Sequence, residues 1–191
     1  KQHVQAGGRA VVLEEGVNGQ MITLYDKGAH VPLLWTHLIP ATLEGRARHN
    51  VQNAMFAAAM AHALSVKLED IRHGLRTFDT TFFQAPGRMN IFSEHPFKVI
   101  VDYGHNPAAI EAMCRLVERL DVRGRRICVL AAPGDRRDED IAATARVTAG
   151  TFDRWICRRD DGLRGRGPDE IPRMLRDTLV HAGVSADRIE V

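Results

Sequence analysis

Residues 99–120 read VIVDYGHNPAAIEAMCRLVERL, an apolar run followed by a polar turn and an amphipathic segment. The apolar run predicts a strand that ends at Val101. Asn106 is a good helix N-cap and Pro107 a good first helical residue, so we expect a helix over 107–120. Ile110 and Met113 lie on its apolar stripe. The stretch therefore predicts a strand, a loop and a helix in succession.

The same alternation continues to the end of the chain. Strands are expected over 88–93, 97–101, 126–131 and 154–157 and from Arg188 onward, and helices over 139–149 and 169–182. Helices of this length suit right-handed crossovers between strands. This part of the chain is therefore predicted to be an α/β domain with a parallel sheet.

The residues before position 85 have a different character. Short strands are expected over 9–14, 20–25 and 31–35, with one more over 39–43, followed by helices over 50–64 and 68–78. The segment Gln84-Ala85-Pro86-Gly87 interrupts both patterns. We therefore predict two domains, 1–85 and 86–191.

Composition excludes several classes of protein. The 191 residues are 45% hydrophobic, with 26 Lys and Arg against 24 Asp and Glu, which indicates a packed core and argues against binding nucleic acid by bulk charge. No apolar run is long enough to span a bilayer. Three widely spaced cysteines suit the reducing cytoplasm. The chain opens without Met and stops in an expected strand, so we expect it to be cut at both ends, which leaves an upstream targeting signal open.

Polar loops follow three of the expected strands, over 102–107, 131–138 and 158–166. Ligands of open parallel sheets bind at the carboxyl ends of strands, so these loops predict a ligand-facing edge. Asp102 is the best single candidate, because a carboxylate there accepts from ribose hydroxyls or joins a magnesium–phosphate shell. The alternative is a turn residue that caps local amides.

Four other positions are candidates on their residue type. His105 near a helix start and Arg88 after Pro-Gly suit phosphate binding, or are ordinary exposed residues. Asn50 and Asn53, three apart at the start of a helix, share one face. Their amides could hydrogen-bond to the edge of a base, take part in a buried hydrogen-bond network, or cap the helix. Spacing alone leaves these alternatives open.

Several motifs are absent from the sequence. No Gly-Lys pair occurs, so there is no phosphate-binding P-loop. No Cys and His spacing matches a zinc site, and no metal-ligating set is predicted. If the chain handles a nucleotide, the main phosphate loop lies elsewhere.

Three motifs in order resemble the Mur ligase family of ATP-dependent amino-acid ligases: His49-Asn50-x-x-Asn53, Pro86-Gly87-Arg88 and Asp102-Tyr103-Gly104-His105-Asn106-Pro107. The resemblance covers the chain from about Arg9 onward. Within the family it is strongest to the cyanophycin-synthesising branch, whose signature residues 38–54 and 77–88 resemble. It implies that residues 1–85 are the end of the central ATPase domain and 86–191 a Rossmann-like C-terminal lid, truncated at its end.

The resemblance also implies roles for single residues. Asn50 and Asn53 contact adenine, and Asp102 binds ribose. Arg88 approaches the terminal phosphates, and His105 lies beside the ribose-binding aspartate; these two are the implied catalytic residues.

The loop over 160–164 is placed like the one that holds the incoming amino acid, which makes Asp160, Asp161 and Arg164 the implied substrate-binding residues. This loop departs from the family's usual Asn-Pro, having Gly162-Leu163 instead.

The implied reaction is amide synthesis with ATP and Mg²⁺ as cofactors. A carboxylate takes the γ-phosphate to become an acyl phosphate, and an amine then displaces phosphate. In the cyanophycin branch the amine is the α-amino group of L-arginine and the carboxylates are aspartate side chains of a poly-Asp primer. The implied partners are these substrates, the P-loop core and aspartate-adding ATP-grasp domain of the same polypeptide, and further copies in a homo-oligomer. Without the P-loop this piece is expected to be inactive alone.

Three rival functions remain. One is another Mur-type ligase that acts on a peptidoglycan precursor or a folate, and a second is a non-catalytic nucleotide-binding or assembly module. The third is polyanion binding by the Arg-rich residues 154–176. Interspersed acidic residues and a single aromatic, Trp155, argue against the third.

Overall fold

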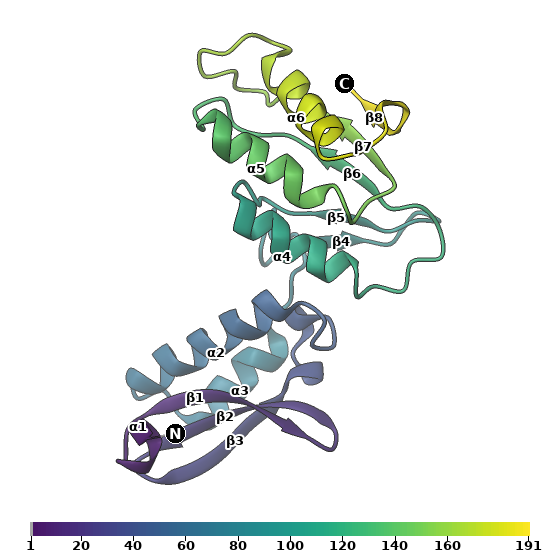
Figure 1. Cartoon of the computed structure of the whole chain (residues 1–191). Helices are drawn as coiled ribbons and strands as arrows, with labels where there is room; N and C mark the ends of the chain where they lie inside the picture. The colour runs from purple at the N-terminus through teal and green to yellow at the C-terminus, as the bar shows by residue number, and fades with distance from the viewer. Residues whose placement is uncertain (1) are drawn as a thin grey trace. The chain divides into compact units, whose positions relative to one another are not determined.

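The computed structural model describes residues 2–191. Contacts divide the chain into two compact units that meet in sequence between Tyr103 and Gly104 (Figure 1). We call residues 2–103 the first unit and residues 104–191 the second unit. Within the described residues, no helix is both long and apolar enough to cross a membrane.

The first unit opens with a short helix, α1 (Gln2–Gln5), and an antiparallel sheet in the order β1-β2-β3. The strands β1 (Ala10–Gly16), β2 (Gly19–Asp26) and β3 (Ala29–Trp35) confirm the three expected strands. Lys27 and Gly28 join β2 to β3 with φ of 49° and 84°, the left-handed pair that a two-residue hairpin turn requires.

Two helices pack on this sheet, α2 (Arg48–Ala63) and α3 (Leu68–Thr77). Ala54 and Ala58 of α2 and Ile71 of α3 meet Ile22 and Leu24 of β2 in one buried cluster. Small alanines let α2 approach the sheet closely. Both expected helices are confirmed, within a few residues at their ends.

The strand expected over 39–43 is wrong. The chain instead forms two 3₁₀ turns, η1 (Thr36–Leu38) and η2 (Pro40–Thr42). Pro40 has no N–H to give to a sheet, and the Thr42 hydroxyl donates to the carbonyls of Thr36 (2.7 Å) and Ile39 (2.8 Å). These bonds close a turn in place of a strand.

The first unit ends in a hairpin of two short strands, β4 (Asn90–Phe92) and β5 (Val99–Val101). They pair antiparallel and belong to a sheet of their own, contrary to the expected parallel arrangement. Residues 93–98 are too few for the crossover of about a dozen residues that parallel pairing requires.

The second unit is the expected parallel α/β structure. Its order is α4 (Pro107–Val117), β6 (Ile127–Leu130), α5 (Asp138–Thr148), β7 (Arg154–Cys157), α6 (Glu170–His181), η3 (Ala186–Arg188) and β8 (Ile189–Glu190). The strands β6, β7 and β8 are parallel and adjacent in that order. Asn106 caps α4 as predicted, accepting from the Ala109 N–H at 2.9 Å. The fold class, mixed α/β with a parallel C-terminal part, is confirmed.

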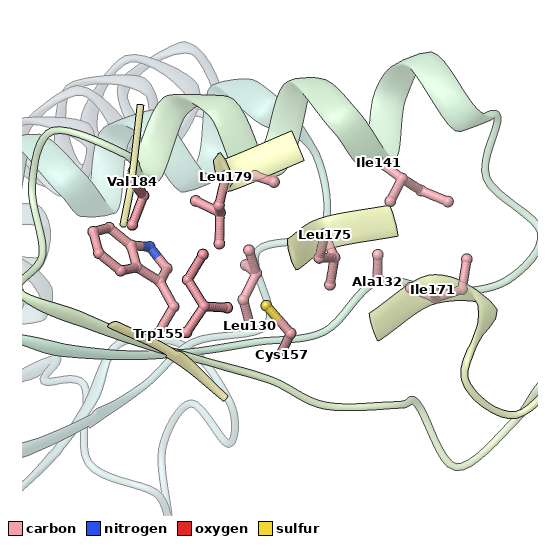
Figure 2. Packing of buried hydrophobic residues seen from close by; sticks show 11 residues of the cluster. Leu130, Ala132, Ile141, Trp155, Cys157, Ile171, Leu175, Leu179 and Val184 are labelled. Carbon is pink, nitrogen blue, oxygen red and sulfur yellow. The ribbon is translucent and has the colours of Figure 1, made fainter. Parts of the chain in front are cut away.

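The core of the second unit lies between this sheet and its helices. Figure 2 shows Trp155 and Cys157 of β7 near Leu175 and Leu179 of α6. Trp155 is fully buried, and its indole N–H donates to the Thr148 hydroxyl at 2.9 Å. This core fixes where the loops that follow β6 and β7 emerge.

Candidate functional site

The antiparallel hairpin brings two of the predicted motifs together. Because β4 begins where β5 ends, the turn before β4 lies beside the residues after β5. The Met89 N–H donates to Oδ2 of Asp102 at 2.9 Å, and the Tyr103 N–H donates to the Gly87 carbonyl at 2.7 Å. The Pro-Gly-Arg turn and Asp102 therefore form one local structure in the first unit.

The start of α2 reaches the same place. Asn50 Nδ2 donates to the Ala41 carbonyl at 2.7 Å and lies 3.8 Å from Sδ of Met89. Asn53 Nδ2 donates to Oδ1 of Asn50 at 3.1 Å. Asn50 is thus committed to protein partners, whereas Asn53 stands exposed one turn further along the helix. The two asparagines form a connected pair, as their spacing indicated.

Met89 is the residue that links these parts, and the sequence reasoning missed it. It is 2% exposed and adopts φ of 51°, a left-handed conformation that is unfavourable for a bulky side chain. Its backbone contacts Asp102 and its sulfur contacts Asn50. An apolar residue after Pro-Gly-Arg carries no sequence signal for such a role.

Asn90 was also missed, and it holds the turn itself. Its side chain is buried, with 1% exposure. Its Oδ1 accepts from the Gly87 N–H at 2.7 Å, and its Nδ2 donates to the carbonyls of Thr80 (2.7 Å) and Ala85 (2.9 Å). These bonds fix the backbone that presents Arg88.

Arg88 is exposed, and its guanidinium lies 5.5 Å from the centre of the Tyr103 ring. His49, before Asn50, is half-buried; burial lowers the pKa of its imidazole, while the charge of Asp102 opposes that shift. The first unit therefore gathers an exposed cation, a carboxylate and two amides around Met89. His105 belongs to the second unit, where it is half-buried in the loop before α4.

A second group of polar residues lies in the loops after β6 and β7. We call residues 131–137 the β6 loop and residues 158–169 the β7 loop. The Arg158 N–H donates to the Leu130 carbonyl at 2.9 Å, so the two loops begin side by side. Gly134 is buried, and a Cβ there would collide with the carbonyl oxygen of Leu163. The loops are therefore in direct backbone contact.

The predicted substrate-binding residues all lie in the β7 loop. Asp161 pairs with Arg158 at 3.0 Å and Arg164 with Asp135 of the β6 loop at 2.6 Å. The Arg164 hydrogen bond lowers the pKa of Asp135. Asp160, half-buried, accepts from the Asp161 N–H at 3.0 Å.

Within residues 2–191, no group of three or more His, Cys, Asp or Glu side chains is arranged to hold a metal ion. The three cysteines are all unpaired thiols in the second unit. Burial raises the pKa of Cys128 to about 12 and that of Cys157 to about 11, so both stay protonated at neutral pH.

The family described as Mur ligase, glutamate ligase domain, matches residues 87–191, more than half of the chain. The chain belongs to the Mur ligase family. The match begins at the Pro-Gly-Arg turn, whereas the contacts divide the chain after Tyr103. The domain boundary after residue 85 stays a prediction.

Curated relatives within the Mur ligase family are similar along nearly the whole chain. The cyanophycin synthetase of Trichormus variabilis is 38% identical over 189 residues, covering 97% of this chain and 19% of that protein. That of Crocosphaera subtropica is 35% identical over 189 residues, covering 97% and 20%. The chain thus spans about a fifth of the length of these relatives.

Solved structures confirm the Mur ligase fold. The Mycobacterium tuberculosis folylpolyglutamate synthase complexed with ADP superposes with a TM-score of 0.62 at 18% identity, covering 95% of this chain and 37% of that one. At this identity the likeness concerns the fold alone.

Proposed function

We propose that this chain is part of an ATP-dependent ligase of the cyanophycin synthetase type. The ligase would join the α-amino group of L-arginine to aspartate side-chain carboxylates of a poly-Asp primer through an acyl phosphate. The observation that carries the proposal is 35–38% identity to cyanophycin synthetases over 97% of the chain. The cluster of Asn50, Arg88 and Asp102 around Met89 supports nucleotide binding by the first unit.

In the proposed nucleotide site, Asn53 contacts adenine and Asp102 accepts from the ribose hydroxyls. Asn50 is held by Ala41, so it orients Asn53, whose exposed amide faces the base. Arg88, exposed on a rigid turn, stabilises the negative charge of the transferred phosphoryl group.

Mg²⁺ fits this site only together with ATP. Magnesium in such enzymes is held by one or two carboxylates plus the substrate's phosphates, and it neutralises charge on those phosphates. The part of the chain that the structure describes has no three-ligand group of its own. We therefore propose that phosphate oxygens supply most of the ligands, and that Asp102 serves the ribose.

In the proposed amino-acid site, Asp160 is the better candidate for the arginine guanidinium. Asp161 and Arg164 already pair with Arg158 and Asp135. Among the carboxylates of the two loops that the structure describes, Asp160 alone has no arginine partner. A carboxylate without an arginine partner can form a charge-assisted pair with the guanidinium of a substrate.

The proposed partner of the first unit is the P-loop-bearing remainder of the same polypeptide. Phe56 and Met60 of α2 and its C-cap residue Leu64 follow one another at four-residue spacing and are 67%, 62% and 80% exposed. The other face of α2 is already buried through Ala54 and Ala58. A helix that is apolar on both faces is typical of a protein interior. The length of the relatives supports such a remainder. A homo-oligomer and a cytoplasmic location also stay part of the proposal.

The test is ADP release by the full-length parent protein, given a cyanophycin-type primer and each amino acid in turn. We expect release with arginine, and a fall of about 100-fold in Arg88→Ala and Asp102→Ala. Asp160→Asn should raise the KM for arginine about tenfold, whereas the matched variant Asp161→Asn should change it little. Release with another amino acid would keep the ligase and overturn the substrate. No amino-acid-dependent release would favour a non-catalytic module.

A further inference from the structure

Arg166 has more polar partners than Arg164, the neighbouring arginine that the sequence analysis singled out. Its Nε donates to the Gly134 carbonyl at 3.0 Å and its Nη2 to the Arg136 carbonyl at 2.8 Å. The same guanidinium pairs with Asp138 at 2.6 Å and with Glu170 at 2.8 Å. Its side chain is 19% exposed, against 49% for Arg164.

The partners of Arg166 belong to three different elements. Gly134 and Arg136 supply carbonyls of the β6 loop, Asp138 is the first residue of α5, and Glu170 is the first residue of α6. Glu170 also accepts from the Gly167 N–H at 3.0 Å. Hydrogen bonds from Arg166 and Gly167 lower the pKa of Glu170, so its carboxylate remains charged at neutral pH. One side chain of the β7 loop thus ties together the β6 loop and the starts of both helices.

This arrangement requires a guanidinium. Arginine presents five N–H donors in a planar fork, whereas lysine offers one compact ammonium. Nε, Nη1 and Nη2 of Arg166 each have a separate acceptor. A lysine at position 166 would keep the charge but lose the carbonyl bonds that hold the β6 loop.

Backbone contact between the β6 and β7 loops restricts how far either loop can shift relative to the other. Leu163 lies directly against Gly134, only three residues from Arg166. A loop pressed this closely to its neighbour moves with it as one surface, provided that the bonds of Arg166 are in place.

We propose that Arg166 is a positioning residue that holds the β7 loop against the β6 loop and thereby sets the affinity for the incoming amino acid. The inference rests on the proposed function, because the β7 loop carries Asp160, Asp161 and Arg164. Arg166 acts through these residues and does not itself contact the substrate.

The test compares Arg166→Lys and Arg166→Met in the full-length protein. The matched controls are Arg173→Lys and Arg173→Met, since Arg173 is 70% exposed and has a single carboxylate contact at 3.5 Å. We expect both Arg166 variants to raise the KM for arginine about tenfold and to leave the KM for ATP within about twofold. Hydrogen exchange in peptides covering 131–138 and 158–168 should become faster. The Arg173 variants should change neither quantity.

The outcomes separate this inference from the proposed function. If the wild-type protein releases ADP with arginine but Arg166→Lys keeps both the wild-type KM and the wild-type exchange, the positioning role is wrong and the ligase stands. If the wild-type protein releases no ADP with any amino acid, the proposed function fails and the link to substrate affinity fails with it. Hydrogen exchange in the Arg166 variants then still shows whether Arg166 holds the two loops together: faster exchange supports this role, and unchanged exchange overturns it. Should Arg166→Met not fold, the lysine variant carries the test.

Discussion

The turn that presents Arg88 and the loops that carry Asp160 are held by different kinds of interaction. In the first unit, the turn depends on Asn90 and Met89, which are 1% and 2% exposed. Asn90 holds the turn through its neutral side-chain amide, and the Met89 N–H donates to the Asp102 carboxylate. In the second unit, the loops depend on pairs such as Arg164 with Asp135, whose side chains are 49% and 52% exposed.

The two arrangements differ in how rigidly they hold their residues. A buried amide with several hydrogen bonds is costly to disturb, because each group left without a partner loses its solvation as well as its bond. An exposed ion pair contributes little by itself and weakens further in salt. The turn in the first unit is therefore a preorganised structure. The loops in the second unit can adjust, except where Arg166, with 19% of its side chain exposed, joins them and where Gly134 is in direct backbone contact.

The largest expected effect comes from Asn90→Ala. The substitution leaves the Gly87 N–H and the Thr80 carbonyl without their partner, whereas the Ala85 carbonyl keeps the Arg88 N–H at 3.1 Å. We expect a loss of about 4 kcal/mol in the free energy of unfolding of the first unit, from two unsatisfied groups at about 1–3 kcal/mol each. Urea unfolding followed by circular dichroism measures it. Asn18→Ala, at an exposed hairpin position, is the control and should change little. A loss for Asn90→Ala no larger than the control's would show that the turn does not depend on this amide.

A smaller effect is expected from Gly134→Ala. The new Cβ collides with the Leu163 carbonyl, so the β6 and β7 loops must separate. We expect a destabilisation of about 2 kcal/mol, as for other overpacked sites. Gly150→Ala is the matched control, since no atom lies within 4 Å of its added Cβ. Equal stability of the two variants in thermal denaturation would mean that the loops separate freely.

Much of the fold was predictable because the periodicity of the sequence is strong. The strand over 154–157 and the cap at Asn106 were predicted correctly from local signals alone. The segment 39–43 was not, because Thr42 uses its hydroxyl to close a turn. The hairpin of β4 and β5 was predicted with the wrong pairing, although the short connection over 93–98 already excluded a crossover.

The candidate sites were predictable only in part. Asn50, Arg88 and Asp102 carry chemistry that their motifs indicate, but Met89 and Asn90 act through burial and backbone contacts. In the β7 loop, nothing in the sequence distinguishes the roles of Arg158, Arg164 and Arg166. Their partners distinguish them, and Asp135 and Asp138 lie about thirty residues away along the chain. Spacing within one loop therefore does not indicate which arginine is the least exposed.

The smallest expected effect is that of salt, which distinguishes the two regions without any substitution. Raising NaCl from about 0.05 M to about 0.5 M shortens the screening length from above 10 Å to a few ångströms. The exposed pairs Arg164–Asp135 and Arg158–Asp161 should weaken, and amide exchange in the β7 loop should rise about threefold. Exchange at Gly87 should stay constant, because its N–H donates to the neutral, buried side-chain amide of Asn90. Equal acceleration in both regions would mean that the turn, too, is held by charge. Acceleration in neither would mean that Arg166 and Gly134 hold the loops without help from the surface pairs.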